Sequence, residues 1–511
     1  MTQALDQMSH PRDDQKCPRC QQINRFTAEE AAEMIPHGAT IGFSGFTPAG
    51  AAKAVPRALA EKARRLHDKG EDFKIRVLTG ASTGDAFDEA LARADAIDWR
   101  APYQSSKTLR NRINNQETSF IDMHLSHVAQ MTDYGFFGNL DFAVVEAVDV
   151  TFDGRVYLST SGGVSPTYLQ NADKVIIEIN RYHSTRLSEM HDVARMPKPP
   201  YRSPIPVLHP LSKMGVPFAS VDPAKIVGII ETDEPDGVAP FTEPDAVSEK
   251  IAGHVIAFLV HERKAGRIPD EFLPLQSGVG NVANAVLGGL GESPDIPPFY
   301  MYTEVFQDAA MQLLEQGKML GASATSLTLS DDWMQKLYGD MDTYAPQIVL
   351  RPQELSNNPG IIRRLGVIAI NTALEVDIYG HANSTHVCGT QLMNGIGGSG
   401  DFMRNAYLSI FVAPSVAKKG AISAILPMCS HVDHSEHDVQ IVVTDQGLAD
   451  LRGLGPLQRA ETIIKNCAHP DYQPLLREYL ENAPGGHLRH DLNKAFDMHR
   501  RFLETGSMLP Q

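Results

Sequence analysis

The sequence contains little cysteine, little tryptophan and no long hydrophobic run. Only 5 of its 511 residues are Cys and 2 are Trp. Five cysteines in a chain of this length do not form the disulfide framework of a small secreted protein. No apolar stretch approaches the roughly 20 residues that a membrane span requires. Residues 1–16 lack an apolar core and include Asp6, Asp13 and Asp14, so we expect neither a secretory signal nor a mitochondrial transit peptide, and we predict a cytoplasmic protein.

Positive charge is also scarce. The chain has 46 Lys and Arg against 62 Asp and Glu, which makes its formal net charge −16. A chain this acidic repels nucleic acid and anionic lipid, and no basic cluster reverses the field, so we predict no nucleic-acid or membrane partner. Hydrophobic residues make up 42% and charged residues 21%, a globular balance that excludes extended disorder.

Short β-branched runs alternate with longer helical patterns along the chain. This alternation is typical of α/β folds, in which parallel strands are buried on both faces. The first helix starts at Thr27, whose hydroxyl and Glu30 predict a capping box. The expected strands lie at 39–42, 74–79, 142–148, 174–179, 224–231, 348–350, 367–373, 421–426 and 439–444, and expected helices lie at 49–69 and 245–262.

The pattern predicts a polar arm over residues 1–26 and two open α/β domains, over residues 27–235 and 236–511. A proline-rich stretch at residues 196–206 suits a crossing between structured parts, because proline lacks the backbone N–H that helices and strands use. No sequence repeat relates the two halves by eye.

Four glycine-bearing turns follow expected strands, at residues 42–50, 80–84, 278–283 and 394–402. Such turns leave backbone N–H groups free at the carboxyl ends of strands, where open α/β sheets bind ligands. A single glycine pair is better explained by a tight turn, but residues 395–400 contain four glycines and predict close approach of a ligand. None of the turns continues as a Walker loop or completes a dinucleotide fingerprint.

Glu304 follows a proline break in an apolar setting, beside Tyr302, Val305 and Phe306. Partial desolvation there would suit a nucleophile or a base. From the residues alone, a helix-start glutamate with Asp308 one turn on explains the pattern more simply.

Two groups of residues suggest metal. The run at residues 430–438 contains His431, His434 and His437 with three acidic residues, but its spacing matches no zinc motif, and a polar loop explains it better. Cys17 and Cys20 are half of a zinc knuckle without a second Cys pair. We therefore predict no metal.

Several segments, in order from about residue 27 to the end, together resemble the acetyl-CoA hydrolase/transferase family of class I CoA-transferases. The matching segments are 45–50, 276–284, 302–305, 321–325, 351–357, 370–375, 393–402 and 430–437.

The resemblance implies two related α/β domains with the active site between them, acyl-CoA and small carboxylic acids as substrates, no cofactor besides coenzyme A itself as a substrate, and a homodimer. It implies that Glu304 is a nucleophile that forms an acyl-glutamyl anhydride and then a glutamyl-CoA thioester. The implied CoA donor is acetyl-CoA or succinyl-CoA, and the implied acceptor is succinate or acetate. The remaining implied site residues bind a developing oxyanion or let CoA approach; they are Asn357, Val279, Gly280, Gly397, Gly398 and Gly400.

Three alternatives stay open. An acetyl-CoA hydrolase would use the same Glu304 with water as acceptor, and a CoA-binding protein without catalysis would use the same scaffold. A zinc-dependent hydrolase would be built on the three histidines of the 430–438 run. One departure from the family pattern bears on the acceptor, because Gly237 stands where some members carry an arginine that can pair with a carboxylate.

Overall fold

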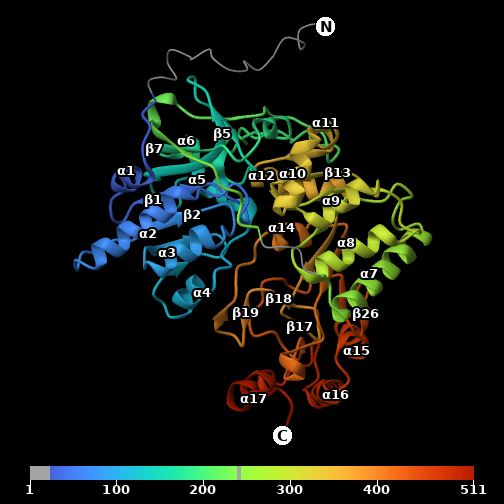
Figure 1. The fold of residues 1–511 in the computed structure, drawn as a ribbon. Helices are drawn as coiled ribbons and strands as arrows, with labels where there is room; N and C mark the ends of the chain where they lie inside the picture. The colour runs from blue at the N-terminus through green and yellow to red at the C-terminus, as the bar shows by residue number, and fades with distance from the viewer. Residues whose placement is uncertain (1–22, 239–242, 511) are drawn as a thin grey trace.

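The computed structural model describes residues 23–238 and 243–510. Two large sheets lie side by side and are surrounded by helices (Figure 1). The first sheet has nine strands, with β1 near its centre between β2 and β5, and β7 and β9 extending it beyond β5. Its strand pairs are parallel except β5 with β6 and β6 with β8. They are β1 (Thr40–Phe43), β2 (Ile75–Leu78), β3 (Ile97–Ala101), β4 (Ser119–Phe120), β5 (Phe142–Val150), β6 (Arg155–Leu158), β7 (Lys174–Asn180), β8 (Ala219–Ser220) and β9 (Ile226–Thr232).

The second sheet has eight strands in the order β15-β13-β11-β10-β16-β21-β25-β26. All of its pairs are parallel except β25 with β26. The strands are β10 (Leu275–Ser277), β11 (Phe299–Tyr302), β13 (Met319–Ala324), β15 (Ile348–Leu350), β16 (Ile368–Thr372), β21 (Leu408–Val412), β25 (Ile441–Thr444) and β26 (Gly447–Asp450). Two sheets of this kind confirm the predicted α/β fold class.

Smaller pairings flank the second sheet. Their strands are β12 (Val305–Gln307), β14 (Ser326–Thr328), β17 (Glu375–Asp377), β18 (Ala382–Asn383), β19 (His386–Val387), β20 (Gln391–Leu392), β22 (Val416–Ala417), β23 (Ile422–Ser423) and β24 (Ile425–Leu426). The strand expected at 421–426 is therefore divided between β23 and β24, which belong to two different small sheets.

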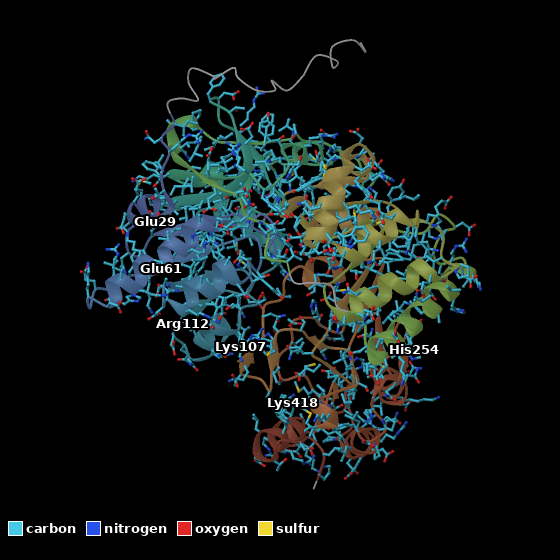
Figure 2. The ribbon with its side chains drawn as sticks, viewed as in Figure 1. Glu29, Glu61, Lys107, Arg112, His254 and Lys418 are labelled. Atoms are coloured by element: carbon cyan, nitrogen blue, oxygen red, sulfur yellow. The ribbon has the colours of Figure 1, made fainter. Side chains whose placement is uncertain are left out.

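The α-helices that surround the sheets are α1 (Ala28–Glu33), α2 (Ala54–His67), α3 (Ala90–Arg93), α4 (Lys107–Asn114), α5 (Leu125–Asp133), α6 (Ser165–Asn171), α7 (Ala246–Lys264), α8 (Asn281–Glu292), α9 (Asp308–Glu315), α10 (Asp331–Gly339), α11 (Met341–Tyr344), α12 (Gln353–Ser356), α13 (Pro359–Leu365), α14 (Ser399–Met403), α15 (Pro456–Cys467), α16 (Gln473–Asn482) and α17 (Asp497–Thr505). Charged side chains such as Glu29, Glu61 and Lys107 project from the outer helices (Figure 2). Within the described residues, none of these helices combines the length and the apolar character needed to cross a bilayer.

The predicted capping box forms at α1. The backbone N–H of Glu30 donates to Thr27 Oγ1 at 3.2 Å, and that of Thr27 donates to Glu30 Oε2 at 2.9 Å. The helix expected from residue 49 begins only at Ala54, because the preceding turn has left-handed backbone at Gly45, Thr47 and Gly50, which no α-helix accommodates.

The two sheets fall on either side of the predicted domain boundary at residue 235. The boundary lies after β9 and before α7, in a segment whose described residues form no helix or strand. The boundary itself stays a prediction. The two halves touch directly, since backbone bridges join Ser161 to Ser326 and His191 to Leu350.

Candidate active site

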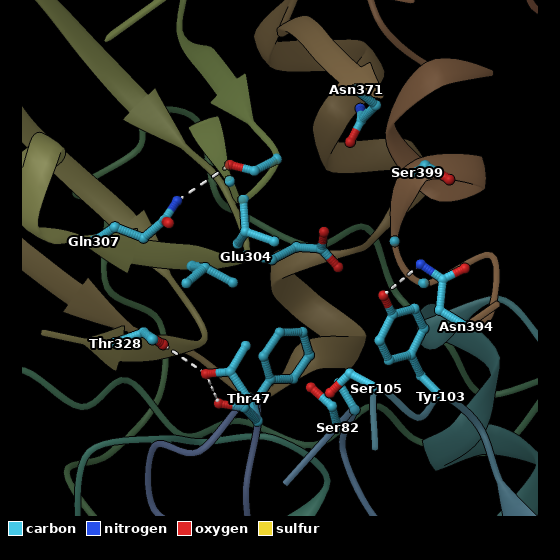
Figure 3. A pocket seen from close by; sticks show the side chains of 18 of the residues that line it. Thr47, Ser82, Tyr103, Ser105, Glu304, Gln307, Thr328, Asn371, Asn394 and Ser399 are labelled. Carbon is cyan, nitrogen blue, oxygen red and sulfur yellow. Dashed lines mark hydrogen bonds between the residues drawn. The ribbon is translucent and has the colours of Figure 1, made fainter. Parts of the chain in front are cut away.

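A cavity of about 540 Å³ is lined by residues from both halves of the chain (Figure 3). All four glycine-bearing turns contribute to its wall, through residues 46–48, 81–82, 278–280 and 394–399. The first three turns directly follow β1, β2 and β10, which is the edge where parallel sheets bind ligands. The tertiary structure therefore gathers at one cavity four turns that are spread over more than 350 residues of sequence.

Glu304 lies between β11 and β12, and its carboxylate faces the cavity (Figure 3). Its backbone carbonyl accepts hydrogen bonds from the N–H groups of Thr325 and Ser326, which holds the residue at the point where the two strands separate. Burial raises the pKa of the Glu304 carboxyl to about 7; the hydrogen bond from Asn357 opposes this shift, and the charge of Asp401 adds to it. The helix-start interpretation is wrong, because α9 begins only at Asp308.

Asn357 follows the short helix α12 and reaches the nucleophile candidate directly. Its Nδ2 donates to Glu304 Oε1 at 2.6 Å. Its Oδ1 accepts from the hydroxyl of Ser356 at 3.0 Å, a contact that is compatible with the amide NH₂ facing the carboxylate. The structure thus brings together two residues that are 53 positions apart in the sequence.

Gly398 packs against the Glu304 carboxylate more closely than any other residue type would allow. A Cβ at this position would lie 1.8 Å from Glu304 Oε1 and 2.1 Å from its Cδ. Gly397, Val279 and Gly280 also line the cavity. Gly400 does not: it lies inside α14, and a Cβ there would meet the ring of His124 at 2.3 Å. The need for glycine at position 400 therefore comes from packing between helices and not from the cavity.

Gly237, which departs from the family pattern, lies next to a residue of the cavity wall. Val238 lines the cavity, and a Cβ built on the neighbouring Gly237 would meet nothing within 4 Å. A larger side chain would therefore have room where this chain has glycine.

The sequence reasoning missed several polar side chains in the wall. Asn394 Nδ2 donates to the Tyr103 hydroxyl at 3.0 Å, and burial raises the pKa of Tyr103. Across the cavity, the hydroxyls of Thr47 and Thr328 lie 2.6 Å apart (Figure 3). Tyr103 follows β3, which alternates apolar and charged residues and has no glycine after it, so no pattern in the sequence marks it.

The histidine-rich run at residues 430–438 is a polar loop, as the sequence predicts. His434 is buried and its Nε2 lies 3.0 Å from the Ser399 hydroxyl, while the side chain of His437 is 82% exposed. Among the described residues, the only trio of His, Cys, Asp or Glu with ligand atoms within 4.8 Å of one another is Glu146, His183 and Asp236. The ligand atoms of the three histidines of the run form no such trio in the described structure, so the geometry gives no support to the zinc hydrolase. Cys17 and Cys20 lie outside the described residues.

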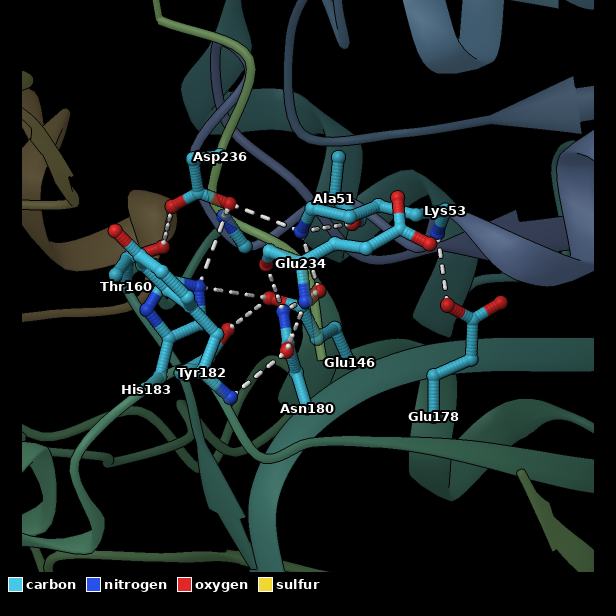
Figure 4. A network of polar contacts seen from close by, with 12 residues as sticks. Ala51, Lys53, Glu146, Thr160, Glu178, Asn180, Tyr182, His183, Glu234 and Asp236 are labelled. Atoms are coloured by element: carbon cyan, nitrogen blue, oxygen red, sulfur yellow. Dashed lines mark hydrogen bonds and ion pairs between the residues drawn. The ribbon is translucent and has the colours of Figure 1, made fainter. Parts of the chain in front are cut away.

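The trio of Glu146, His183 and Asp236 surrounds the ammonium group of Lys53 (Figure 4). Lys53 Nζ donates to Glu146 Oε2 and, at 3.0 Å, to Asp236 Oδ1. Burial by itself lowers the pKa of Lys53, but the two carboxylates hold it above its ordinary value. The space between the carboxylates thus already contains a cation, and the network is an internal ion cluster.

Replacing Lys53 by Met is expected to destabilise the fold strongly. The change leaves Glu146 and Asp236 buried without their cation, a loss that typically costs about 3–5 kcal/mol. Lys62 is a matched control, because it is also buried but donates chiefly to backbone carbonyls of residues 32–35. Thermal unfolding of both Met variants measures the difference. A loss for Lys53→Met no larger than for Lys62→Met would contradict this interpretation of the cluster.

Comparison with known proteins identifies related sequences. Residues 10–231 match the model of the acetyl-CoA hydrolase/transferase N-terminal domain, and residues 334–480 match that of the C-terminal domain. The chain is 57% identical over 488 residues to the propanoyl-CoA:succinate CoA transferase of Escherichia coli, covering 96% of this chain and 99% of that protein. It is 48% identical to the succinyl-CoA:acetate CoA-transferase of Clostridium kluyveri, over 94% of this chain and 89% of that protein.

Other relatives have a different name. The acetyl-CoA hydrolase of Saccharomyces cerevisiae is 43% identical over 501 residues, 94% of each chain. Among solved structures, that of RipA from Yersinia pestis superposes with a TM-score of 0.69 at 23% identity, covering 90% of this chain and 97% of that one. This last likeness concerns the fold alone.

Proposed function

Because the chain belongs to the acetyl-CoA hydrolase/transferase family, we propose that it transfers CoA from an acyl-CoA to a small carboxylate, with Glu304 as the nucleophile. The observation that carries the proposal is the Glu304 carboxylate itself. It faces a cavity large enough for a ligand, it is desolvated, it accepts a hydrogen bond from Asn357, and it lies against the backbone of Gly398. Acetyl-CoA or succinyl-CoA as donor, with succinate or acetate as acceptor, agrees with the names of the two most similar relatives reported above.

In the first half of the reaction, a carboxylate oxygen of Glu304 attacks the thioester carbonyl carbon. A C–O bond forms, the C–S bond breaks, and CoA leaves as its thiolate from an acyl-glutamyl anhydride. The thiolate then attacks the glutamyl carbonyl carbon of this anhydride. A new C–S bond forms and the bond between the glutamyl carbonyl carbon and the bridging oxygen breaks. The first carboxylate product departs with that oxygen, and a glutamyl-CoA thioester remains.

In the second half, the acceptor carboxylate reverses these steps. Its oxygen attacks the glutamyl thioester and expels the thiolate, which forms a new anhydride. The thiolate attacks the acceptor's acyl carbon, which yields the new acyl-CoA and restores the Glu304 carboxylate. No water or proton is consumed, so the free energy of the thioester is retained.

Each attack places negative charge on a carbonyl oxygen. The Asn357 amide and the backbone N–H groups near Val279, Gly280 and Gly398 are the donors we assign to that charge. Gly280 also precedes α8, whose N-terminus adds a favourable dipole. A donor aimed at a developing oxyanion typically contributes about 3 kcal/mol to the rate.

Hydrolysis is the second candidate, because relatives named acetyl-CoA hydrolase cover almost the whole chain. It differs only in whether water or a carboxylate reaches the glutamyl intermediate first. The homodimer predicted from the family resemblance stays a prediction.

The deciding experiment incubates the protein with acetyl-CoA, with and without succinate, and follows free thiol and new acyl-CoA separately. We expect succinyl-CoA to form only when succinate is present, with little free thiol. Equal release of thiol in both mixtures would replace transfer by hydrolysis. Binding of acetyl-CoA without either product would contradict an enzymatic role and favour a CoA-binding protein.

A further inference from the structure

Asp401 is a buried carboxylate beside the candidate site that the proposed reaction does not use. It lies in α14, three residues after Gly398, and its residue is only 4% exposed. Its Oδ2 accepts from the backbone N–H of Ser126 at 3.0 Å, and its Oδ1 accepts from the Ser126 hydroxyl at 2.6 Å. Ser126 belongs to α5, so Asp401 joins the glycine-rich segment of the second half to a helix of the first.

The same carboxylate also contacts Asn357. The Nδ2 group of Asn357 lies 3.3 Å from Asp401 Oδ2 and 2.6 Å from Glu304 Oε1. A side-chain amide has two N–H bonds, so one nitrogen can donate to both carboxylates at once. If the amide were reversed, its oxygen would face two acceptor oxygens. Asp401 therefore stabilises the orientation in which the Asn357 NH₂ group faces the carboxylates, and it destabilises the reversed orientation.

We propose that Asp401 is a positioning residue that holds the Asn357 amide with its N–H groups directed at Glu304. This inference rests on the proposed role of Glu304 as nucleophile. Because Asp401 is anchored on α5, the orientation of the amide depends on contact between the two halves of the chain. Contact between the two halves thereby affects the hydrogen bond that Asn357 donates to Glu304.

The charge of Asp401 has a separate effect on Glu304. Two carboxylates that share one donor oppose each other's ionisation, which adds to the upward shift that burial gives the pKa of Glu304. Tyr103 lines the same cavity, and the charge of Glu304 adds to the upward shift that burial gives the pKa of Tyr103. At the start of α5, burial lowers the pKa of His124 and of His127, and Arg404 follows α14.

Two substitutions separate position from charge. Asp401→Asn can keep all three hydrogen bonds, since its amide oxygen accepts from Ser126 N–H and Asn357 while its NH₂ donates to the Ser126 hydroxyl, which can then accept. Asp401→Ala removes all three. The measurement is the rate at which acetyl-CoA forms the covalent enzyme–CoA adduct, followed by protein mass between pH 5 and 9 (about two units either side of the expected midpoint).

In the wild-type protein, the rate should rise with pH through about 7, because only the ionised Glu304 attacks. Asp401→Asn should move that midpoint down by about one unit and leave the plateau near that of the wild type. Asp401→Ala should lower the plateau at least about tenfold with little change in the KM for acetyl-CoA. Unchanged midpoint and plateau in both variants would overturn the proposal.

Asp377→Asn is the matched control, because Asp377 is equally buried in the same half and bonds Tyr379 and His381, none of which lines the cavity. Equal effects of all three substitutions would reduce Asp401 to a general structural role and overturn the proposal. Modification of Glu304 by a water-soluble carbodiimide, which reacts with the protonated carboxyl, gives a second readout that needs no turnover. If the wild type forms no adduct, the proposed function fails; the labelling midpoint in Asp401→Asn then still decides the role of Asp401.

Discussion

Replacing Glu304 by Gln is expected to abolish CoA transfer while acyl-CoA still binds. The amide keeps the size of the side chain and can still accept the hydrogen bond from Asn357, but it is not a nucleophile toward a thioester. Exchange between acetyl-CoA and succinate should fall by about a thousandfold or more, as is typical when a covalent nucleophile is removed. The enzyme–CoA adduct should be absent from the protein mass spectrum.

Glu304→Ala and Glu304→Asp test the same assignment from two sides. Alanine removes the group, and aspartate keeps the charge but withdraws it by one methylene from Asn357. Both should lose transfer, with acetyl-CoA affinity nearly intact by direct binding measurement. If Glu304→Ala retains even about one tenth of the wild-type rate, Glu304 is not the nucleophile, because a covalent mechanism does not survive the loss of its attacking atom.

Gly398→Ala should inactivate the protein almost as completely, although it adds a single methyl group. The backbone of Gly398 has ordinary right-handed angles, φ −88° and ψ −5°, so alanine is tolerated locally. The new Cβ would instead occupy the space of the Glu304 carboxylate, 1.8 Å from Oε1. The carboxylate must then move away from Asn357, and a displaced nucleophile loses about a hundredfold in rate.

Gly278→Ala is the matched comparison for this prediction. Gly278 also lines the cavity, but its Cβ would meet only Asn371 Oδ1 at 3.5 Å and Ile370 O at 3.8 Å, which are ordinary contacts. The transfer rates and unfolding temperatures of both variants should be measured together. Similar rates in the two would mean that the contact between Gly398 and Glu304 does not govern the reaction.

Much of the fold could be predicted from local patterns. The strands β1, β5, β7 and β25 were predicted to within two residues because each is rich in β-branched and other apolar residues, which is typical of a strand covered on both faces. The capping box at Thr27 was predicted because its partners are three residues apart. The family itself was also recognisable from ordered segments, and the matches to both domain models confirm it.

Other elements left no local signal. Strand β10 is three residues long, and β3 includes Asp98 and Arg100. Arg100 is fully buried, and its guanidinium donates to the carboxylate of Asp88, twelve positions earlier, and to the backbone carbonyls of Ala81 and Ala101. Such pairs are set by packing, so periodicity does not predict them.

The sequence by itself determined the α/β class, the family and the residue types available for the chemistry. Only the tertiary structure decided which of these residues contact one another. It placed the carboxylate of Glu304 against Gly398 and Asn357, removed Gly400 from the cavity, and put Asp401 between Ser126 and Asn357. The reason is physical: desolvation and the charge of Asp401, 97 positions away, raise the pKa of Glu304, while the hydrogen bond from Asn357, 53 positions away, opposes that shift. Residues so far apart in the sequence become neighbours only when the chain folds.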